Sequence, residues 1–150
     1  MDVKPLYEGV FAVTGGNFDH AGEVSGNIKS VLKKMGLPGD VIRKVSLVSY
    51  ESEINIVSYA RKGMIRLRVV PGSVMIEAID EGQGIPDIDL AMQPGYSTAT
   101  DKIREMGFGA GMGLCNIKSF SDAFYISSEV GKGTYLKMVI KTNGVSETNM

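Results

Sequence analysis

The sequence predicts an α+β fold, a two-layer sandwich in which helices cover one face of a mostly antiparallel sheet. Two observations indicate this class. The 150 residues are 43% hydrophobic and 22% charged, which suits one soluble globular domain with a single core. Segments with alternating and with helical apolar spacing follow in the order strand, two helices, two strands, glycine-rich loop, helix, two strands. We expect one domain over residues 1–150, with its core at about 10–141 and a flexible tail at 142–150.

The first half of the chain predicts one strand and two helices. Residues 9–14 are short and apolar and run into a glycine-rich turn, after which Asp19 is expected to cap a helix that stops at Gly36. A second helix is expected from residues 38–40 to about Lys62, with basic side chains near its negative end. If the polar face of this helix is merely solvated, Glu53 is expected to be one more surface charge.

The second half predicts two hairpins on either side of a long loop. Residues 64–70 and 74–79 alternate apolar with polar around a Pro-Gly-Ser turn, which places Arg66, Arg68 and Glu77 on the solvent side. After the loop, a helix is expected at 112–120 and a closing hairpin at 123–128 and 134–141. The loop itself, residues 80–107, holds only a short helical piece at 88–92, and so long a connection in a small domain is usually functional.

Composition and charge exclude several functional classes. Lys and Arg total 16 against 17 Asp and Glu, so the chain has no strongly basic surface and nucleic acid is not an expected partner. The single cysteine, Cys115, cannot form an internal disulfide, nor can it build a zinc site with the single histidine, His20. No apolar run approaches the roughly 18 residues of a membrane span, and the N-terminus lacks a signal-peptide pattern, so we expect a cytoplasmic protein without a membrane partner.

Glu51 and Asn55 are the first candidate pair. They lie four residues apart on the second predicted helix, so their side chains share one face. A carboxylate and an amide aligned there could serve as a general base and as an oxygen ligand for Mg²⁺. Taken alone, the pair fits a solvated helix face better than a site.

Asp80 ends a predicted buried strand, and Gly82 and Gly84 follow it at alternate positions. A carboxylate held at a strand end can accept a hydrogen bond from an exocyclic amine such as that of adenine, while the glycines let a base approach the main chain. A plain Asp-Gly turn is the alternative, although it would not require the second glycine.

Four glycines stand at every second position of the segment 107–113, directly before a predicted helix. Bare backbone amides at a helix N-terminus favour phosphate. The segment is not a Walker A loop, because no Gly-Lys-Ser/Thr follows, and it is not a Rossmann fingerprint, because no βαβ unit surrounds it.

Together these motifs closely resemble the Bergerat-fold (GHKL) ATPases over about residues 10–141. The matching motifs are Glu51-x-x-x-Asn55, Asp80-x-Gly82-x-Gly84, Gly109-x-Gly111-x-Gly113-Leu114 and Gly133-Thr134. The resemblance implies that Glu51 is the general base, Asn55 the Mg²⁺ ligand, Asp80 the adenine reader and Thr134 its support, with residues 93–113 as a mobile lid. The other nucleotide contacts it implies are Gly82, Gly84, Ile85, Ser97, Thr98, Gly109, Gly111, Met112, Gly113 and Leu114.

Within this superfamily the stretches 84–98 and 128–134 look like those of the bacterial anti-sigma-factor serine/threonine kinases of the RsbW/RsbT type. That resemblance implies ATP-dependent phosphorylation of a small antagonist of the STAS (anti-anti-sigma) class, with a sigma factor as a further partner, in a partner-switching system. ATP or ADP and Mg²⁺ are the implied cofactors, and a homodimer stays open.

The sequence is compatible with two alternatives. The chain could be a nucleotide-gated binding module that holds ATP or ADP and grips a partner without transferring phosphate. It could also be a histidine-kinase-like ATPase domain, although His20 is followed by one short helix and fits a surface or capping residue better than a phosphoacceptor.

Overall fold

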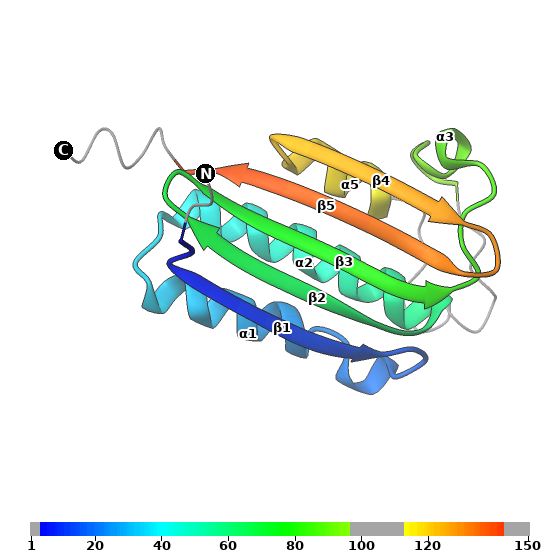
Figure 1. Ribbon diagram of the computed structural model, residues 1–150, viewed down its shortest axis with the longest axis horizontal. Helices are drawn as coiled ribbons and strands as arrows, with labels where there is room; N and C mark the ends of the chain where they lie inside the picture. The colour runs from blue at the N-terminus through cyan, green and yellow to red at the C-terminus, as the bar shows by residue number, and fades with distance from the viewer. Residues whose placement is uncertain (1–3, 97–112, 143–150) are drawn as a thin grey trace.

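The computed structural model describes residues 4–96 and 113–142, and these form one sheet with helices packed on one face (Figure 1). The elements in chain order are β1 (Tyr7–Thr14), the 3-10 turn η1 (Phe18–His20), α1 (Glu23–Lys34), α2 (Gly39–Tyr59), β2 (Ala60–Val70), β3 (Ser73–Gly82), α3 (Ile88–Ala91), α5 (Gly113–Phe120), β4 (Ala123–Glu129) and β5 (Gly133–Lys141). The strands lie in the order β1-β2-β3-β5-β4, and every neighbouring pair is antiparallel. The predicted fold class and element order are confirmed.

The β2–β3 hairpin forms where the sequence predicts it. Gly72 in the turn has φ +87°, a conformation that glycine adopts without steric penalty. Arg66 pairs with Glu77 across the strands, and their side chains form an ion pair of 3.0 Å on the face away from the helices. The alternate residues Ile65 and Leu67 are fully buried, so the period of two separates the two faces as expected.

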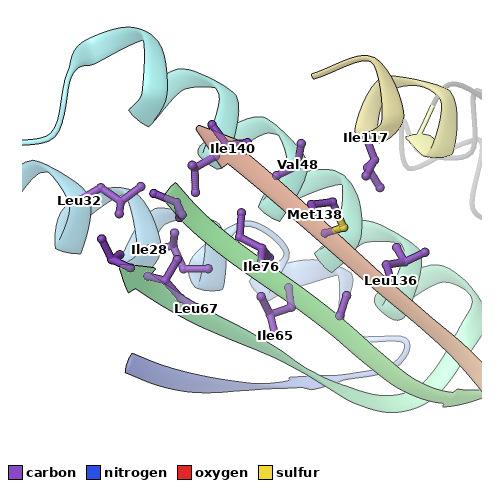
Figure 2. Close-up of a cluster of buried hydrophobic side chains, with 14 of the residues drawn as sticks. Ile28, Leu32, Val48, Ile65, Leu67, Ile76, Ile117, Leu136, Met138 and Ile140 are labelled. Carbon is purple, nitrogen blue, oxygen red and sulfur yellow. The ribbon is translucent and has the colours of Figure 1, made fainter. Parts of the chain in front are cut away.

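The core lies between the sheet and the layer of α1, α2 and α5 (Figure 2). Figure 2 shows Ile28 and Leu32 from α1 and Val48 from α2 meeting the inner face of the sheet, with Ile117 from α5 beside them. This packing fixes the long helix α2 across the strands. The C-terminal half of α2 is thereby held beside α5, an arrangement that positions the site described below.

The second helix ends three residues earlier than predicted. It stops at Tyr59, so Arg61 and Lys62 lie in β2 and not at a helix terminus. Lys62 pairs in register with Thr14 of β1 and Glu81 of β3, and its ammonium lies 3.5 Å from the Glu81 carboxylate. Pairing on both sides supplies the backbone hydrogen bonds of this segment, and this overrides the local helical pattern.

The predicted cap of the first helix is also wrong. Asp19 lies in η1, whereas α1 begins at Glu23 with Gly22 as its N-cap at φ +102°. The backbone N–H groups of Gly22, Val24 and Ser25 donate to the carboxylate of Glu53, at 2.9, 3.2 and 3.0 Å. Glu53 is only 2% exposed and is therefore no surface charge. Its partners lie 28 to 31 residues away in sequence, beyond the reach of a local pattern.

Candidate functional site

Glu51 and Asn55 of α2 face the first residue of α5. A side chain at Gly113 would place its Cβ 3.2 Å from Glu51 Oε2 and 3.3 Å from Asn55 Oδ1. The glycine therefore lets the N-terminus of α5 approach both oxygens closely. The structure brings these three residues together although 58 residues separate Asn55 from Gly113. Two side-chain oxygens and a helix N-terminus thus converge at one point, where anionic and cationic groups can both be held.

The environment of Glu51 suits a group that exchanges protons. Burial raises the pKa of the half-buried Glu51 carboxyl above its ordinary value, and a side-chain hydrogen bond with Asn116 opposes this shift. A carboxylate with a raised pKa is a better proton acceptor near neutral pH. Asn116 lies on α5, one turn after Gly113, and sequence reasoning did not identify it.

Asp80 lies near the end of β3, opposite the start of β5. Its Oδ1 accepts a hydrogen bond of 3.1 Å from the backbone N–H of Thr134. Burial raises the pKa of Asp80, and the hydrogen bond from Thr134 lowers it by a smaller amount. Gly133 has no room for a side chain, because a Cβ there would overlap the Asp80 carbonyl oxygen. The carboxyl is thus held at a strand end with a fixed orientation.

Gly82 and Gly84 pack against other parts of the chain. A Cβ at Gly82 would lie 2.9 Å from the Tyr59 carbonyl oxygen. The Gly82 N–H donates to the carbonyl oxygen of Lys132 at 3.1 Å. Gly84 has φ +76°, and a Cβ there would overlap the Glu129 carbonyl oxygen. Close backbone packing therefore requires glycine at both positions, and this packing holds the β4–β5 turn beside Asp80.

Ser128 connects the segments around Asp80, and sequence reasoning missed this role. Its hydroxyl oxygen accepts from the Ile85 N–H at 2.8 Å and lies 3.0 Å from the Gly133 carbonyl oxygen, to which it can donate. The hydroxyl of Thr134 is also within 2.8 Å. This network ties the chain after β3 to the end of β4 and the start of β5.

Several predicted site residues lie outside the described residues. These are Ser97, Thr98, Gly109, Gly111, Met112 and most of the expected lid at 93–113. Leu114 lies in the first turn of α5 and packs against the core. His20 is a surface residue as expected, because its side chain is 62% exposed and pairs with Glu23 at 2.8 Å. Cys115 is a half-buried free thiol on α5.

Asp80→Asn is expected to raise the free energy of unfolding near pH 7 relative to the wild type. Because the pKa of Asp80 is raised in the folded state, the native protein holds a proton that the unfolded chain has lost at pH values between the unfolded and the folded pKa. The stability that Asp80 contributes below its pKa in the unfolded chain is therefore lost as the pH rises through its pKa in the folded protein. Asparagine stays neutral and can still accept from Thr134, so this loss disappears.

Urea unfolding at several pH values between about 4 and 8 measures the effect. The wild-type curve should fall more steeply with pH than the curve of the variant. The exposed Asp40→Asn serves as the matched control and should follow the wild type. Parallel curves for wild type and Asp80→Asn would show that burial of Asp80 carries no such penalty.

A family model described as a histidine kinase-like ATPase domain matches residues 17–140 of the chain. The chain is 37% identical over 90 residues to an anti-sigma F factor of Caldanaerobacter subterraneus subsp. tengcongensis, a match that covers 60% of this chain and 55% of that protein. It is 31% identical over 115 residues to the serine/threonine-protein kinase RsbT of Bacillus subtilis, a match that covers 74% of this chain and 80% of that kinase. The chain thus spans about half the length of the anti-sigma F factor and most of the RsbT kinase.

Solved structures with the same fold are more distant in sequence. The SiaB-SiaC complex from Pseudomonas aeruginosa matches with a TM-score of 0.56 at 17% identity, over 91% of both chains. The histidine kinase domain of the Erythrobacter litoralis EL346 blue-light activated histidine kinase matches with a TM-score of 0.51 at 17% identity, over 82% of this chain and 61% of that one. Within residues 4–96 and 113–142, no helix has the length and apolar character needed to cross a membrane.

Proposed function

Since the chain belongs to the histidine kinase-like ATPase family, we propose that it binds Mg-ATP and transfers the γ-phosphate to a serine or threonine of a partner protein. The relatives support this proposal by their names, which are anti-sigma F factor and serine/threonine-protein kinase. The proposed substrate is a STAS-type anti-anti-sigma protein, and a sigma factor is the proposed second partner in a cytoplasmic partner-switching system. We propose that residues 1–150 form the single domain that carries out this phosphoryl transfer.

The observation that carries the proposal is the convergence of Glu51, Asn55 and Gly113. In the proposed complex the phosphates lie at the N-terminus of α5, where backbone N–H groups and the helix dipole favour negative charge. Asn55 would hold the Mg²⁺, which prefers hard oxygen ligands and shares them with phosphates. Asn55 Oδ1 and the Glu51 carboxylate both lie close to Gly113, and these oxygen ligands suit Mg²⁺. Glu51 then takes the proton of the attacking hydroxyl.

At the other end of the site, Asp80 would read the adenine amine. Its Oδ1 is occupied by the Thr134 N–H, which orients the carboxyl and leaves Oδ2 as the acceptor for a ligand. Gly82, Gly84 and Ile85 would border the base. Ser97, Thr98, Gly109, Gly111, Met112 and Leu114 complete the proposed nucleotide contacts.

Asn55→Ala is expected to weaken Mg-ATP binding by roughly 10- to 100-fold, the equivalent of one lost interaction with a charged group. Titration calorimetry with Mg-ATP measures this, and the exposed Asn27→Ala on α1 is the matched control. Asp80→Asn should lose affinity to a similar degree while it gains stability. Wild-type affinity in both variants would contradict the proposed placement of the nucleotide.

Labelled ATP and a lysate of the source organism test the transfer step. A kinase labels a protein of the lysate in the presence of Mg²⁺, and mass spectrometry then identifies the modified residue as serine or threonine. The second candidate function, a nucleotide-gated binding module, predicts ATP binding without any labelled protein. The proximity of Glu51 to Asn55 and Gly113 favours the kinase, because a pure sensor needs no base beside the phosphates.

A further inference from the structure

We propose that the groove between α1 and α2 docks an acidic segment of the partner protein and leads its acceptor hydroxyl to Glu51. This inference rests on the proposed function and names a docking surface for it. The two helices are antiparallel neighbours within the helix layer (Figure 1). Groove residues include Gly26 and Lys29 from α1 and Ser46, Leu47, Tyr50 and Glu51 from α2.

The groove is continuous with the proposed catalytic site. Glu51 lines the groove with its α2 neighbours and also faces Asn55 and Gly113. A chain segment that lies in the groove can therefore present one of its side chains to the Glu51 carboxylate. A general base must lie within hydrogen-bond reach of the hydroxyl that it deprotonates, and this geometry provides such a route.

Gly26 indicates that a backbone approaches the groove from outside. A glycine inside a helix lowers helix stability relative to alanine, so it calls for a reason. Gly26 lies in α1 without a positive φ, and a Cβ there would meet no atom of the described residues within 4 Å. By contrast, Gly22 has φ +102° and is required by the turn. Nothing inside the described part of the molecule explains Gly26, whereas close approach of a partner main chain does.

The groove also offers apolar surface. Tyr50 is 38% exposed, and Leu47 beside it is half-buried. An apolar side chain of the partner can therefore cover Leu47 and Tyr50.

Lys29 is the one cation and Glu51 the one anion among the groove residues, and two further cations on the helices favour an acidic partner. Helical spacing places Lys33 on the same face of α1 as Lys29, and Arg43 on the same face of α2 as Leu47. None of these three cations forms an ion pair with a described residue. Between Arg43 and Glu51 the groove positions carry no acidic side chain. Carboxylates of the docked segment can therefore meet Lys29, Lys33 and Arg43 while its hydroxyl lies at Glu51.

Gly26→Leu and Lys29→Glu test the docking surface. A Cβ at position 26 meets no described atom within 4 Å, so the leucine is expected to occupy the groove, and Asn27→Leu adds the same side chain at the next, exposed position. Lys34→Glu reverses the same charge on another face of the same helix. The probes are two fluorescent 12-residue peptides with one serine, one flanked by glutamates and one by lysines.

We expect the acidic peptide to bind the wild type by fluorescence polarisation and the basic peptide not to bind. Amide shifts in ¹⁵N spectra should then cluster at residues 22–33 and 43–51. Gly26→Leu and Lys29→Glu should each weaken the acidic peptide by roughly tenfold or more, whereas Asn27→Leu and Lys34→Glu should not. Absence of binding by the wild type, shifts elsewhere, or equal affinity in groove and control variants would overturn the proposal.

The labelling experiment separates this inference from the proposed function. Loss of lysate labelling in the two groove variants, with ATP affinity retained, supports docking in the groove. Full labelling in both variants would overturn the docking surface and leave the kinase intact. Absence of labelling by the wild type together with groove binding of the acidic peptide would instead reject phosphoryl transfer and keep the docking surface.

Discussion

Glu51→Gln is expected to slow phosphoryl transfer by roughly 100- to 10,000-fold, the usual contribution of a general base, while Mg-ATP affinity stays close to wild type. Glutamine keeps the size of the side chain and its hydrogen bond with Asn116 but cannot accept the proton of the hydroxyl. Glu51 lies beside the proposed phosphate position, whereas the base is assigned to Asp80, so Glu51 has no role in holding the base. Single-turnover labelling of the identified partner measures the rate.

Glu23→Gln is the matched control for this variant, because Glu23 is an exposed carboxylate at the start of α1. It should transfer phosphate at the wild-type rate. A wild-type rate in Glu51→Gln would remove the kinase mechanism and make the nucleotide-gated binding module the better description. A loss of ATP affinity equal to the loss of rate would instead make Glu51 a binding residue.

The order of strands and helices could be predicted because it depends on local periodicity. The alternation from Met64 to Ile79 and the Pro-Gly turn between the strands define the β2–β3 hairpin without any distant contact. The shared face of Glu51 and Asn55 likewise follows from helix geometry alone. What these patterns could not show is which distant element meets that face.

The features that the sequence did not reveal depend on contacts between distant segments. Asn116 meets Glu51 only because α5 packs against α2, and Ser128 meets Ile85 only because β4 ends beside the loop after β3. The early end of α2 has the same origin, since Lys62 belongs to a strand through pairing on both sides. In each case the tertiary partner decides the role of a residue whose local pattern is neutral or misleading.

Glu53 gives the largest expected effect on stability. Its carboxylate accepts three backbone N–H groups at the start of α1, donors that a helix cannot satisfy within itself. Glu53→Ala leaves these donors without a partner in a site where the side chain is 2% exposed, and it opens a cavity between the helices. We expect the free energy of unfolding to fall by about 2 to 5 kcal/mol, measured by urea denaturation.

Glu53→Gln separates the acceptor chemistry from the packing. Both carboxylate oxygens accept, Oε2 from Gly22 and Val24 and Oε1 from Ser25, so an amide must turn its NH₂ toward at least one N–H. Glutamine should therefore also destabilise, although it fills the space. Glu23→Ala, at an exposed position one residue after the N-cap, should change stability by less than about 0.5 kcal/mol. If Glu53→Ala unfolds at the urea concentration of the wild type, α1 does not depend on this cap. In that event the wall of the groove that leads to Glu51 is held by core packing, in which Ile28 and Leu32 are the fully buried side chains of α1.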